Sequence, residues 1–314
     1  MNTIPFATQQ EWLALRKQGI GGSDASAVLG VNPYKSQIEV YLDKIGETEP
    51  IPDNPFMFWG RKLEPLIREE FQQQTGFDVH EIPALLQSDK FPFMIGSVDG
   101  IGTTHQGRPF VLECKTANGK QATVWKDGQV PIHYVLQLAH YLSITGYTLG
   151  FFAVLIGGND FRIIPVERDR DVEAMMVEGE REFWRKVEAR ELPQIDGSQA
   201  TADALLQMYP REVPDSSHLL PADTFQSVCQ QLIALKQQVK EHETSITQLE
   251  NLLKNELGEH ETGRCGDFQL AWKTVESTRF DTKAFRTVHA DLYDSFTKPS
   301  SYRRFSIKNT QQEE

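Results

Sequence analysis

Helical spacing of apolar residues dominates the N-terminal part of the chain. Over residues 8–46 apolar positions recur every three or four residues, and a glycine-rich turn at 19–22 interrupts them. Ser23 or Asp24 could cap a helix over 25–29, because a short oxygen-bearing side chain satisfies free amides at a helix start. The pattern therefore predicts helix, turn and helix in this region.

A second capping signal and a proline-rich linker follow. Ser36 is expected to cap a helix that runs to about Lys44. The expected linker contains three prolines: Pro50, Pro52 and Pro55. The next helical pattern covers about 58–75, and Gly76 is expected to end it because glycine adopts the left-handed backbone of a helix C-terminus without strain.

From residue 77 the pattern changes to short apolar or alternating runs separated by Gly, Pro and Asp, which is typical of strands. The expected strands are 77–81, 85–87, 94–99 and 109–115, and we expect them to be successive strands of one sheet. The elements that should follow are a helix over 131–145, a hairpin of 148–156 with 160–166, and a helix over 169–190. Helices around a mixed sheet predict an α/β sandwich.

The C-terminal third has a different organisation. We expect one large core over 1–192, an irregular connector over 193–221, and a long helix with a small α/β tail over 222–314. Within the helix the apolar residues step alternately by four and three, as in a coiled coil with a polar break at His242. The seam residues are Leu232, Leu235, Val239, His242, Ile246, Leu249 and Leu253. In the tail, strands are expected at 265–272 and 303–307 around a helix at 281–292.

Composition narrows the function classes. A signal peptide and an apolar run of bilayer length are both missing from the pattern, so a cytoplasmic location without membrane contact is expected. Three separated cysteines make neither a disulfide framework nor a zinc motif. The net charge of −12 argues weakly against nucleic acid, but residues 263–308 carry nine Lys or Arg against five Asp or Glu.

The strongest chemical signal is Asp99 followed by the triplet Glu113-Cys114-Lys115. Side chains alternate along a strand, so Glu113 and Lys115 share one face, and strand pairing would bring Asp99 beside them. Carboxylates are hard ligands for Mg²⁺ or Mn²⁺, and such an ion acidifies water for phosphodiester hydrolysis. The backbone carbonyl of Cys114 could be a further ligand. Taken alone, such a triplet is far more often a solvent salt bridge on an ordinary edge strand.

Three further groups could belong to the same site. Glu64 could complete the metal shell, directly or through water, or could be a solvent-facing helical glutamate. Gln137 and Tyr141 lie four residues apart on one helix face, which could reach the site or pack in the core. Arg16 and Ser23 could hold a terminal phosphate beside a helix start, although a serine cap would also explain Ser23.

Together and in this order, these groups resemble the lambda-exonuclease-like branch of the PD-(D/E)XK nucleases, the YqaJ-type viral recombinase family. The matching stretches are Trp12 with Arg16, GIGGSDASAVLG (19–30), WGRKLEP (59–65), IGSVDG (95–100), LECKT (112–116) and the helix of Gln137 and Tyr141. The resemblance covers about 8–190. It implies a restriction-endonuclease-like core, to which residues 193–314 add an appendage.

The resemblance also implies an activity. Members digest linear double-stranded DNA from 5′ to 3′ in phage-type recombination, beside a single-strand annealing protein and commonly as a ring-shaped trimer. It implies Mg²⁺ bound by Asp99 and Glu113, catalysis by Lys115 with Glu64 and Gln137, and a 5′-phosphate held near Arg16, Ser23 and Tyr141. The alternatives are a structure-specific or nicking endonuclease on the same fold, and a catalytically dead DNA-binding scaffold.

Overall fold

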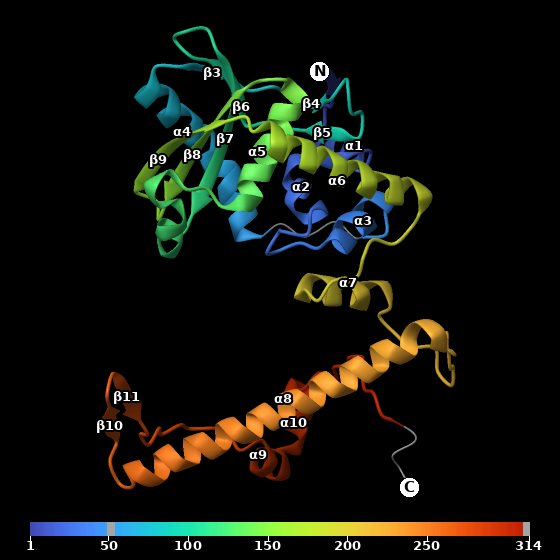
Figure 1. Cartoon of the computed structure of the whole chain (residues 1–314), viewed down its shortest axis with the longest axis vertical. Helices are drawn as coiled ribbons and strands as arrows, with labels where there is room; N and C mark the ends of the chain where they lie inside the picture. The colour runs from blue at the N-terminus through green and yellow to red at the C-terminus, as the bar shows by residue number, and fades with distance from the viewer. Residues whose placement is uncertain (49–53, 310–314) are drawn as a thin grey trace. The chain divides into compact units, whose positions relative to one another are not determined.

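The computed structural model describes residues 1–48 and 54–309 of the chain (Figure 1). Pro50 and Pro52 of the expected linker lie outside the described residues, and Pro55 is the first residue of a helix. The chain divides into two compact units, Met1–Met208 and Tyr209–Glu314, which are described separately. The predicted limits of the core and the connector stay predictions.

The first unit combines helices with two sheets. Its helices are α1 (Gln9–Arg16), α2 (Gly22–Val28), α3 (Gln37–Ile45), α4 (Pro55–Thr75), α5 (Ile132–Thr145), α6 (Arg170–Ala189), α7 (Gln199–Met208) and the 3₁₀ segment η1 (Gly119–Gly128). Its strands are β1 (Asn2–Pro5), β2 (Ile20–Gly21), β3 (Asp78–His80), β4 (Ala84–Gln87), β5 (Met94–Gly96), β6 (Gly100–Thr103), β7 (Pro109–Ala117), β8 (Leu149–Ile156) and β9 (Asp160–Glu167).

The strands form two sheets rather than the single one expected. One sheet has the order β3-β6-β7-β8-β9, and the other has the order β1-β4-β5-β2. The run 94–99 caused the error, because its strand ends at Gly96 and a separate strand begins at Gly100 in the other sheet. Asp99 therefore lies in the short connection between the two sheets, immediately before β6.

Strand β7 lies in the middle of the larger sheet. It pairs antiparallel with β6 and parallel with β8, with Glu113 opposite Phe152. Parallel neighbours need a crossover connection, which η1 and α5 supply. The hairpin of β8 and β9 turns at Gly157 and Gly158, both in the left-handed backbone region, as the sequence predicts.

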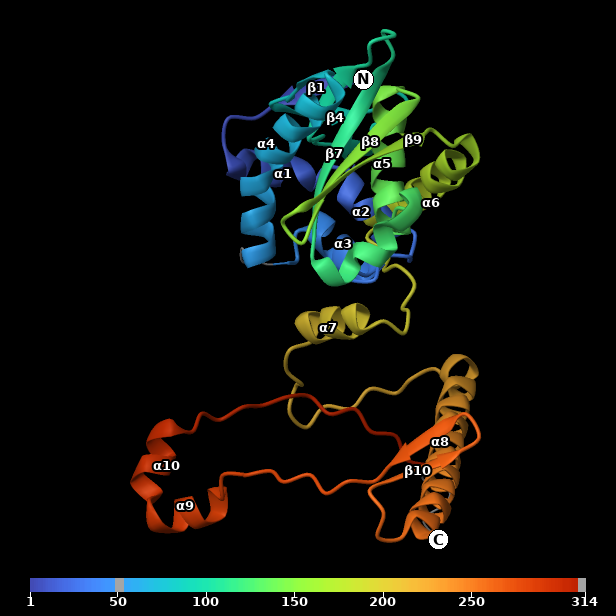
Figure 2. The ribbon, with the colours of Figure 1, turned by 90° about the vertical axis from the view of Figure 1, so that its left-hand side faces the viewer.

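Helices cover both faces of this sheet. Helix α4 packs Ile67 and Phe71 against Phe110, Leu112 and neighbouring residues on one face. On the other face α5 contributes Leu138 to a cluster that includes Val111 and Phe152. Figure 2 shows α4 and α5 on opposite sides of β7 and β8. The predicted α/β sandwich is therefore confirmed.

The helix starts show where local sequence signals predicted the N-cap correctly and where they did not. Ser36 caps α3 as predicted, and its hydroxyl accepts a hydrogen bond from the Glu39 amide. Helix α2 instead begins at Gly22, so neither Ser23 nor Asp24 is its N-cap. Helix α7 occupies part of the segment expected to be irregular and packs Ala204 against α3 and α6.

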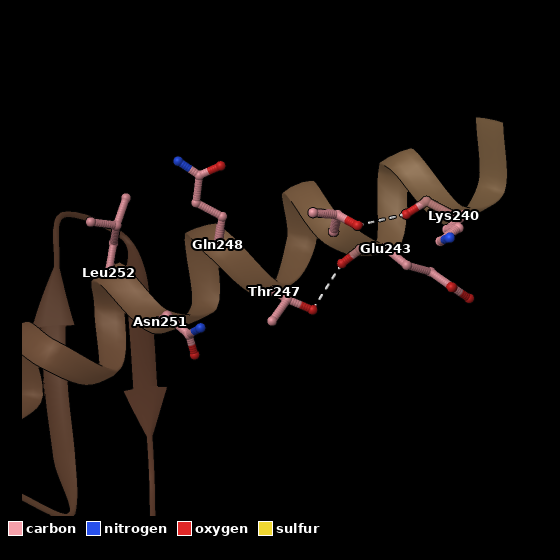
Figure 3. Close-up of a pocket in the computed structure, with 7 residues that line it drawn as sticks. Lys240, Glu243, Thr247, Gln248, Asn251 and Leu252 are labelled. Carbon is pink, nitrogen blue, oxygen red and sulfur yellow. Dashed lines mark hydrogen bonds between the residues drawn. The ribbon is translucent and has the colours of Figure 1, made fainter. Parts of the chain in front are cut away.

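The second unit is built around α8 (Ala222–Leu257), followed by the hairpin β10 (Thr262–Cys265) and β11 (Phe268–Ala271) and by α9 (Thr282–Val288) and α10 (Ala290–Phe296). The predicted strand at 303–307 is wrong, because that segment has no regular structure. Figure 3 shows the polar face of α8, along which Lys240, Glu243, Gln248 and Asn251 line an open hollow of about 640 Å³. Among the described residues, no helix is long and apolar enough to cross a membrane.

Candidate active site

Strand β7 carries the centre of the candidate site. Glu113 is buried, with 2% of its surface exposed, and its Oε1 accepts a hydrogen bond from the Lys115 ammonium at 2.6 Å. Asp99 is tied to the same strand, because its Oδ2 accepts a hydrogen bond from the Cys114 amide at 2.7 Å. The pairing of Gly100 with Leu112 sets this contact. The structure thus brings Asp99, Glu113 and Lys115 together, as the strand alternation predicted.

Helix α5 adds Gln137 to these residues. The amide of Gln137 donates to Glu113 Oε1 at 2.6 Å and to the Tyr141 hydroxyl at 3.2 Å, and its oxygen accepts from Lys115 at 3.0 Å. The four-residue spacing on one helix face therefore leads Gln137 into the site, with Tyr141 buried behind it. The Lys115 ammonium also lies 4.7 Å from the centre of the Tyr134 ring, a cation–π contact.

Glu64 reaches the site from α4 together with an arginine that the sequence analysis missed. Arg68 Nη1 lies 3.4 Å from Glu64 Oε1 and also donates to the backbone carbonyl of Asp99. Its Nη2 donates to Glu81 Oε2 at 2.9 Å. Arg68 is four residues after Glu64, so their pairing was readable from the sequence, but its contact with Asp99 depends on the fold.

The site holds more negative than positive charge in a poorly hydrated place. Burial, and then the nearby Asp99, raise the pKa of Glu113 to about 8 and that of Glu64 to about 7. Burial also raises the pKa of Asp99. Burial lowers the pKa of Lys115, but Glu113 and Asp99 outweigh it and keep the pKa above its usual value. The carboxylates of Asp99, Glu113, Glu64 and Glu81 thus outnumber the two cations, Lys115 and Arg68.

This arrangement fits a divalent cation of the Mg²⁺ type. Glu113 Oε2 is buried without a hydrogen-bond partner, an unfavourable state that a cation would relieve. In the part of the chain that the structure describes, no three His, Cys, Asp or Glu side chains gather as a metal-holding group. The predicted set needs only two such side chains, Asp99 and Glu113, because Mg²⁺ keeps several waters and accepts backbone carbonyls.

A second polar group surrounds the start of α2. Arg16 Nη2 donates to the Ser23 hydroxyl at 3.1 Å, as the proposed pairing of these residues requires. Trp12 supports Arg16, since the guanidinium lies 4.8 Å from its ring centre, and its indole N–H donates to Ser97 at 3.0 Å. Ser23 is free of a capping role and exposed, so its hydroxyl can face a ligand.

Beneath this group lies a buried charge cluster that the sequence analysis missed. The Asp24 carboxylate is 1% exposed and lies 2.8 Å from both the Lys35 and the Lys44 ammonium groups. Arg16 Nη2 lies 3.9 Å from the same carboxylate. Burial raises the pKa of Asp24, but the lysines outweigh it and hold the pKa well below its usual value. Three cations against Asp24 and the partly exposed Asp43, which lies 3.6 Å from Lys44, leave net positive charge at the start of α2.

Tyr141 lies between the two groups. A Cβ atom at Gly22, on α2, would meet the Tyr141 ring at 2.5 Å, and one at Gly96, on β5, would meet it at 2.6 Å. Both positions therefore require glycine while the ring stays in place. Because the Tyr141 hydroxyl contacts Gln137, the start of α2 and the Glu113 site share one buried side chain.

Comparisons with known proteins decide the family. A family model described as the YqaJ-like viral recombinase domain matches residues 11–148, a range that contains every predicted site residue. The uncharacterized protein YqaJ of Bacillus subtilis is 35% identical over 306 residues, covering 96% of this chain and 94% of that protein. The chain belongs to the YqaJ-like viral recombinase family.

A solved structure extends the family assignment to the fold. An alkaline exonuclease from Laribacter hongkongensis is 22% identical, with a TM-score of 0.50 over 58% of this YqaJ-family chain and 94% of the exonuclease chain. Protein R354 of Acanthamoeba polyphaga mimivirus is 33% identical over 92 residues, 29% of this chain and 17% of that protein. The family and the nuclease fold predicted from the motifs are therefore confirmed.

Proposed function

We propose that this YqaJ-family chain is a Mg²⁺-dependent exonuclease that digests linear double-stranded DNA from the 5′ end. The observation that carries the proposal is the buried Glu113 carboxylate, held by Lys115 and Gln137 beside Asp99, with one oxygen left without a partner. One oxygen of Glu180, which pairs with His140, is also buried without a partner, so a free oxygen alone does not indicate a metal. At Glu113 it supports a metal site because Asp99 supplies a second carboxylate beside it.

Each side chain has a role in this proposal. Asp99 and Glu113 would hold Mg²⁺ with the Cys114 carbonyl, and Glu64 would assist directly or through water. When bound, the ion supplies positive charge against the scissile phosphate and makes nearby water more acidic. Lys115, charged because of its two carboxylate neighbours, places an ammonium where negative charge builds up on the phosphate. Gln137 would hold the Lys115 ammonium and the Glu113 carboxylate in position through its two hydrogen bonds.

The preference for a 5′ end rests on the group at the start of α2. Arg16 and the Ser23 hydroxyl form an exposed donor pair above the positive cluster of Lys35 and Lys44. Guanidinium and hydroxyl groups at a helix start bind phosphate well. Tyr141 lies against this region and would fix its distance from Glu113.

Activity is tested on linear and circular duplexes of one sequence, with Mg²⁺, Mn²⁺ or EDTA. We expect digestion of the linear form only, and only with metal. Glu113→Gln and Lys115→Ala should each lose activity at least a hundredfold, whereas Lys120→Ala, an exposed lysine beyond β7, should keep it. Equal cutting of circles would favour the nicking endonuclease, and DNA binding without cleavage would favour the inactive scaffold.

Polarity is tested on duplexes labelled at either end, with a 5′-phosphate or a 5′-hydroxyl. We expect faster release from 5′-phosphorylated ends, and Arg16→Gln together with Ser23→Ala should remove that preference. Release that starts at the 3′ end would refute the assigned direction.

The family also motivates proposals about assembly. We propose that the enzyme acts in phage-type recombination beside a single-strand annealing protein, and that it assembles as a homotrimer. Analytical ultracentrifugation tests the trimer directly, and a single species of monomer mass would refute it. Annealing of the digested strand, assayed with and without a candidate protein encoded nearby, tests the recombination role.

A further inference from the structure

The last segment of the second unit has an unusual surface. Residues 263–308 contain eight aromatic side chains, and six of them are between 49% and 84% exposed. These six are Phe268, Trp272, Phe280, Phe296, Tyr302 and Phe305. Water-exposed aromatic rings lose the stabilisation that burial would give, so a surface with this many rings is suited to contact with a ligand.

The charge of this segment differs from that of the rest of the molecule. It has nine Lys or Arg against five Asp or Glu, a net charge of +4, whereas the remaining residues have 23 against 39, a net charge of −16. Within the described ranges, no ion pair forms at Arg279, Lys283 or Arg304. The segment therefore presents cations that acidic neighbours do not neutralise.

Basic and aromatic residues alternate closely along this segment. Trp272 precedes Lys273, Arg279 precedes Phe280, and Tyr302 and Phe305 flank a pair of arginines. Residues 272–280 and 297–309 have no helix or strand, and Figure 2 shows both as long extended stretches on either side of α9 and α10. An extended chain spaces its side chains widely, so a ring and a cation can serve successive units of a polymer.

We propose that residues 263–308 form a binding surface for single-stranded nucleic acid. Cations contact the phosphates, and exposed aromatic rings stack on unpaired bases; this combination is the usual chemistry of single-strand binders. A duplex hides its base faces, so it could use the cations but not the rings. A second copy of this acidic chain could also meet the cations, which makes self-association the competing outcome.

The hollow along α8 does not explain the aromatic surface. It is lined by one helix only, and its labelled side chains in Figure 3 are mostly polar. Lys240 and Lys254, which lie on α8 outside the proposed surface, serve as controls for charge. Lys254 pairs with Glu250 at 2.8 Å, so Lys240 is the better match to the unpaired arginines. Leu235 and Leu249, exposed on α8, serve as controls for apolar surface.

The experiment measures fluorescence anisotropy of a labelled 20-nucleotide oligo-dT and of a 20-base-pair duplex with the full chain in EDTA. Chelation prevents digestion, so the result is independent of the proposed activity. The aromatic variant combines Trp272→Ala, Phe280→Ala and Tyr302→Ala. We expect it to bind oligo-dT at least tenfold more weakly and the duplex with little change, while Leu235→Ala with Leu249→Ala binds like the parent.

Salt dependence tests the charges. Replacing Arg279 and Arg304 with Gln should lower the slope of log affinity against log salt by about 1.4, since each phosphate contact on a single strand contributes about 0.7. Gln at Lys240 and Lys254 should leave the slope unchanged. Far-UV circular dichroism confirms that each variant is folded.

Equal oligo-dT affinity of the aromatic variant and the parent would overturn the proposal. If the sedimentation mass of that variant also changes, the surface is assigned to a second copy of the chain.

Discussion

At the scale of single residues, the buried carboxylates have opposite surroundings. Asp24 has two ammonium groups within 2.8 Å, whereas Glu113 has an oxygen without any partner. The first carboxylate stabilises the fold because its charge is matched. We expect the second to cost stability, because one of its buried oxygens has no partner. Substitutions at the two positions should therefore have opposite effects on stability.

Asp24→Asn should lower the free energy of unfolding by about 3–5 kcal/mol, because it leaves the fully buried Lys44 ammonium without its carboxylate. Urea unfolding followed by circular dichroism measures this change. Asp43→Asn is the control, since Asp43 also lies near Lys44, at 3.6 Å, but is partly exposed. A loss below about 1 kcal/mol in Asp24→Asn would show that the cluster does not hold the start of α2.

Glu113→Gln should raise the melting temperature in EDTA while abolishing activity, because a neutral amide relieves the crowding of Glu113 with Asp99 and Glu64. Mg²⁺ should raise the melting temperature of the parent but not of this variant. Differential scanning fluorimetry measures both effects, and Glu178→Gln, on the exposed face of α6, should behave like the parent. A Mg²⁺ shift that survives in Glu113→Gln would contradict the metal assignment.

At the scale of elements, a buried histidine joins three of them. His140, on α5, has one ring nitrogen 2.8 Å from Glu180 on α6 and the other 3.0 Å from the Ile95 carbonyl on β5. Burial lowers its pKa, but Glu180 outweighs burial and raises the pKa above the usual value, with a smaller contribution from Asp24. The stabilisation from a raised histidine pKa is complete below about pH 6.5 and is lost as pH rises through the folded-state pKa.

The pH dependence of the unfolding free energy of His140→Gln tests this contact between α5, α6 and β5. The difference in unfolding free energy between the parent and the variant should be largest near pH 6. It should shrink above that by up to about 1.4 kcal/mol per pH unit. Urea titrations at pH 6, 7, 8 and 9 measure it. Subtracting the variant removes the contributions of other titrating groups, so a difference that is constant from pH 6 to 9 would refute a charged His140.

The glycine contacts of Tyr141 give a second test at this scale. Gly96→Ala should cost about 1–3 kcal/mol and reduce activity, because the new methyl group would lie 2.6 Å from the Tyr141 ring and displace Gln137. Gly60→Ala, in α4 with nothing within 4 Å, should instead be neutral or stabilising. Combining Gly96→Ala with Tyr141→Leu should recover stability; independent, additive effects would contradict the contact.

The sequence revealed those parts of the fold and site that depend on neighbours along the chain. The Ser36 cap, the hairpin at Gly157 and the shared face of Glu113 and Lys115 follow from spacing alone. The split into two sheets and the contact of Lys44 with Asp24 do not, because they join residues far apart in the chain. The prediction of Ser23 as a possible N-cap of α2 was wrong, because the N-cap is Gly21.

At the scale of the whole molecule, the second unit begins with an exposed stretch without helix or strand, residues 209–221. Arg211 is the only trypsin site in this stretch. Brief trypsin treatment should therefore cut after Arg211 and release a resistant fragment of the first unit, because local order protects the sites within that unit better than those in the exposed stretches of the second. Mass spectrometry identifies the product, and Arg211→Gln should delay it. A first cut inside the β-sheet region would contradict this division of the chain.

The alternation of side chains along β7 also bears on how this protein can change over time. Glu113 and Lys115 face the site, whereas Cys114 packs on the opposite face among Ile67, Phe71 and their neighbours. The three consecutive positions are therefore constrained differently: positions 113 and 115 by charge, and position 114 by side-chain volume. Substitution at position 114 by residues of similar size should be tolerated, whereas substitution of either neighbour would remove a residue of the proposed active site. Substitutions along this one strand therefore affect either the candidate site or the hydrophobic core, depending on which face the side chain occupies.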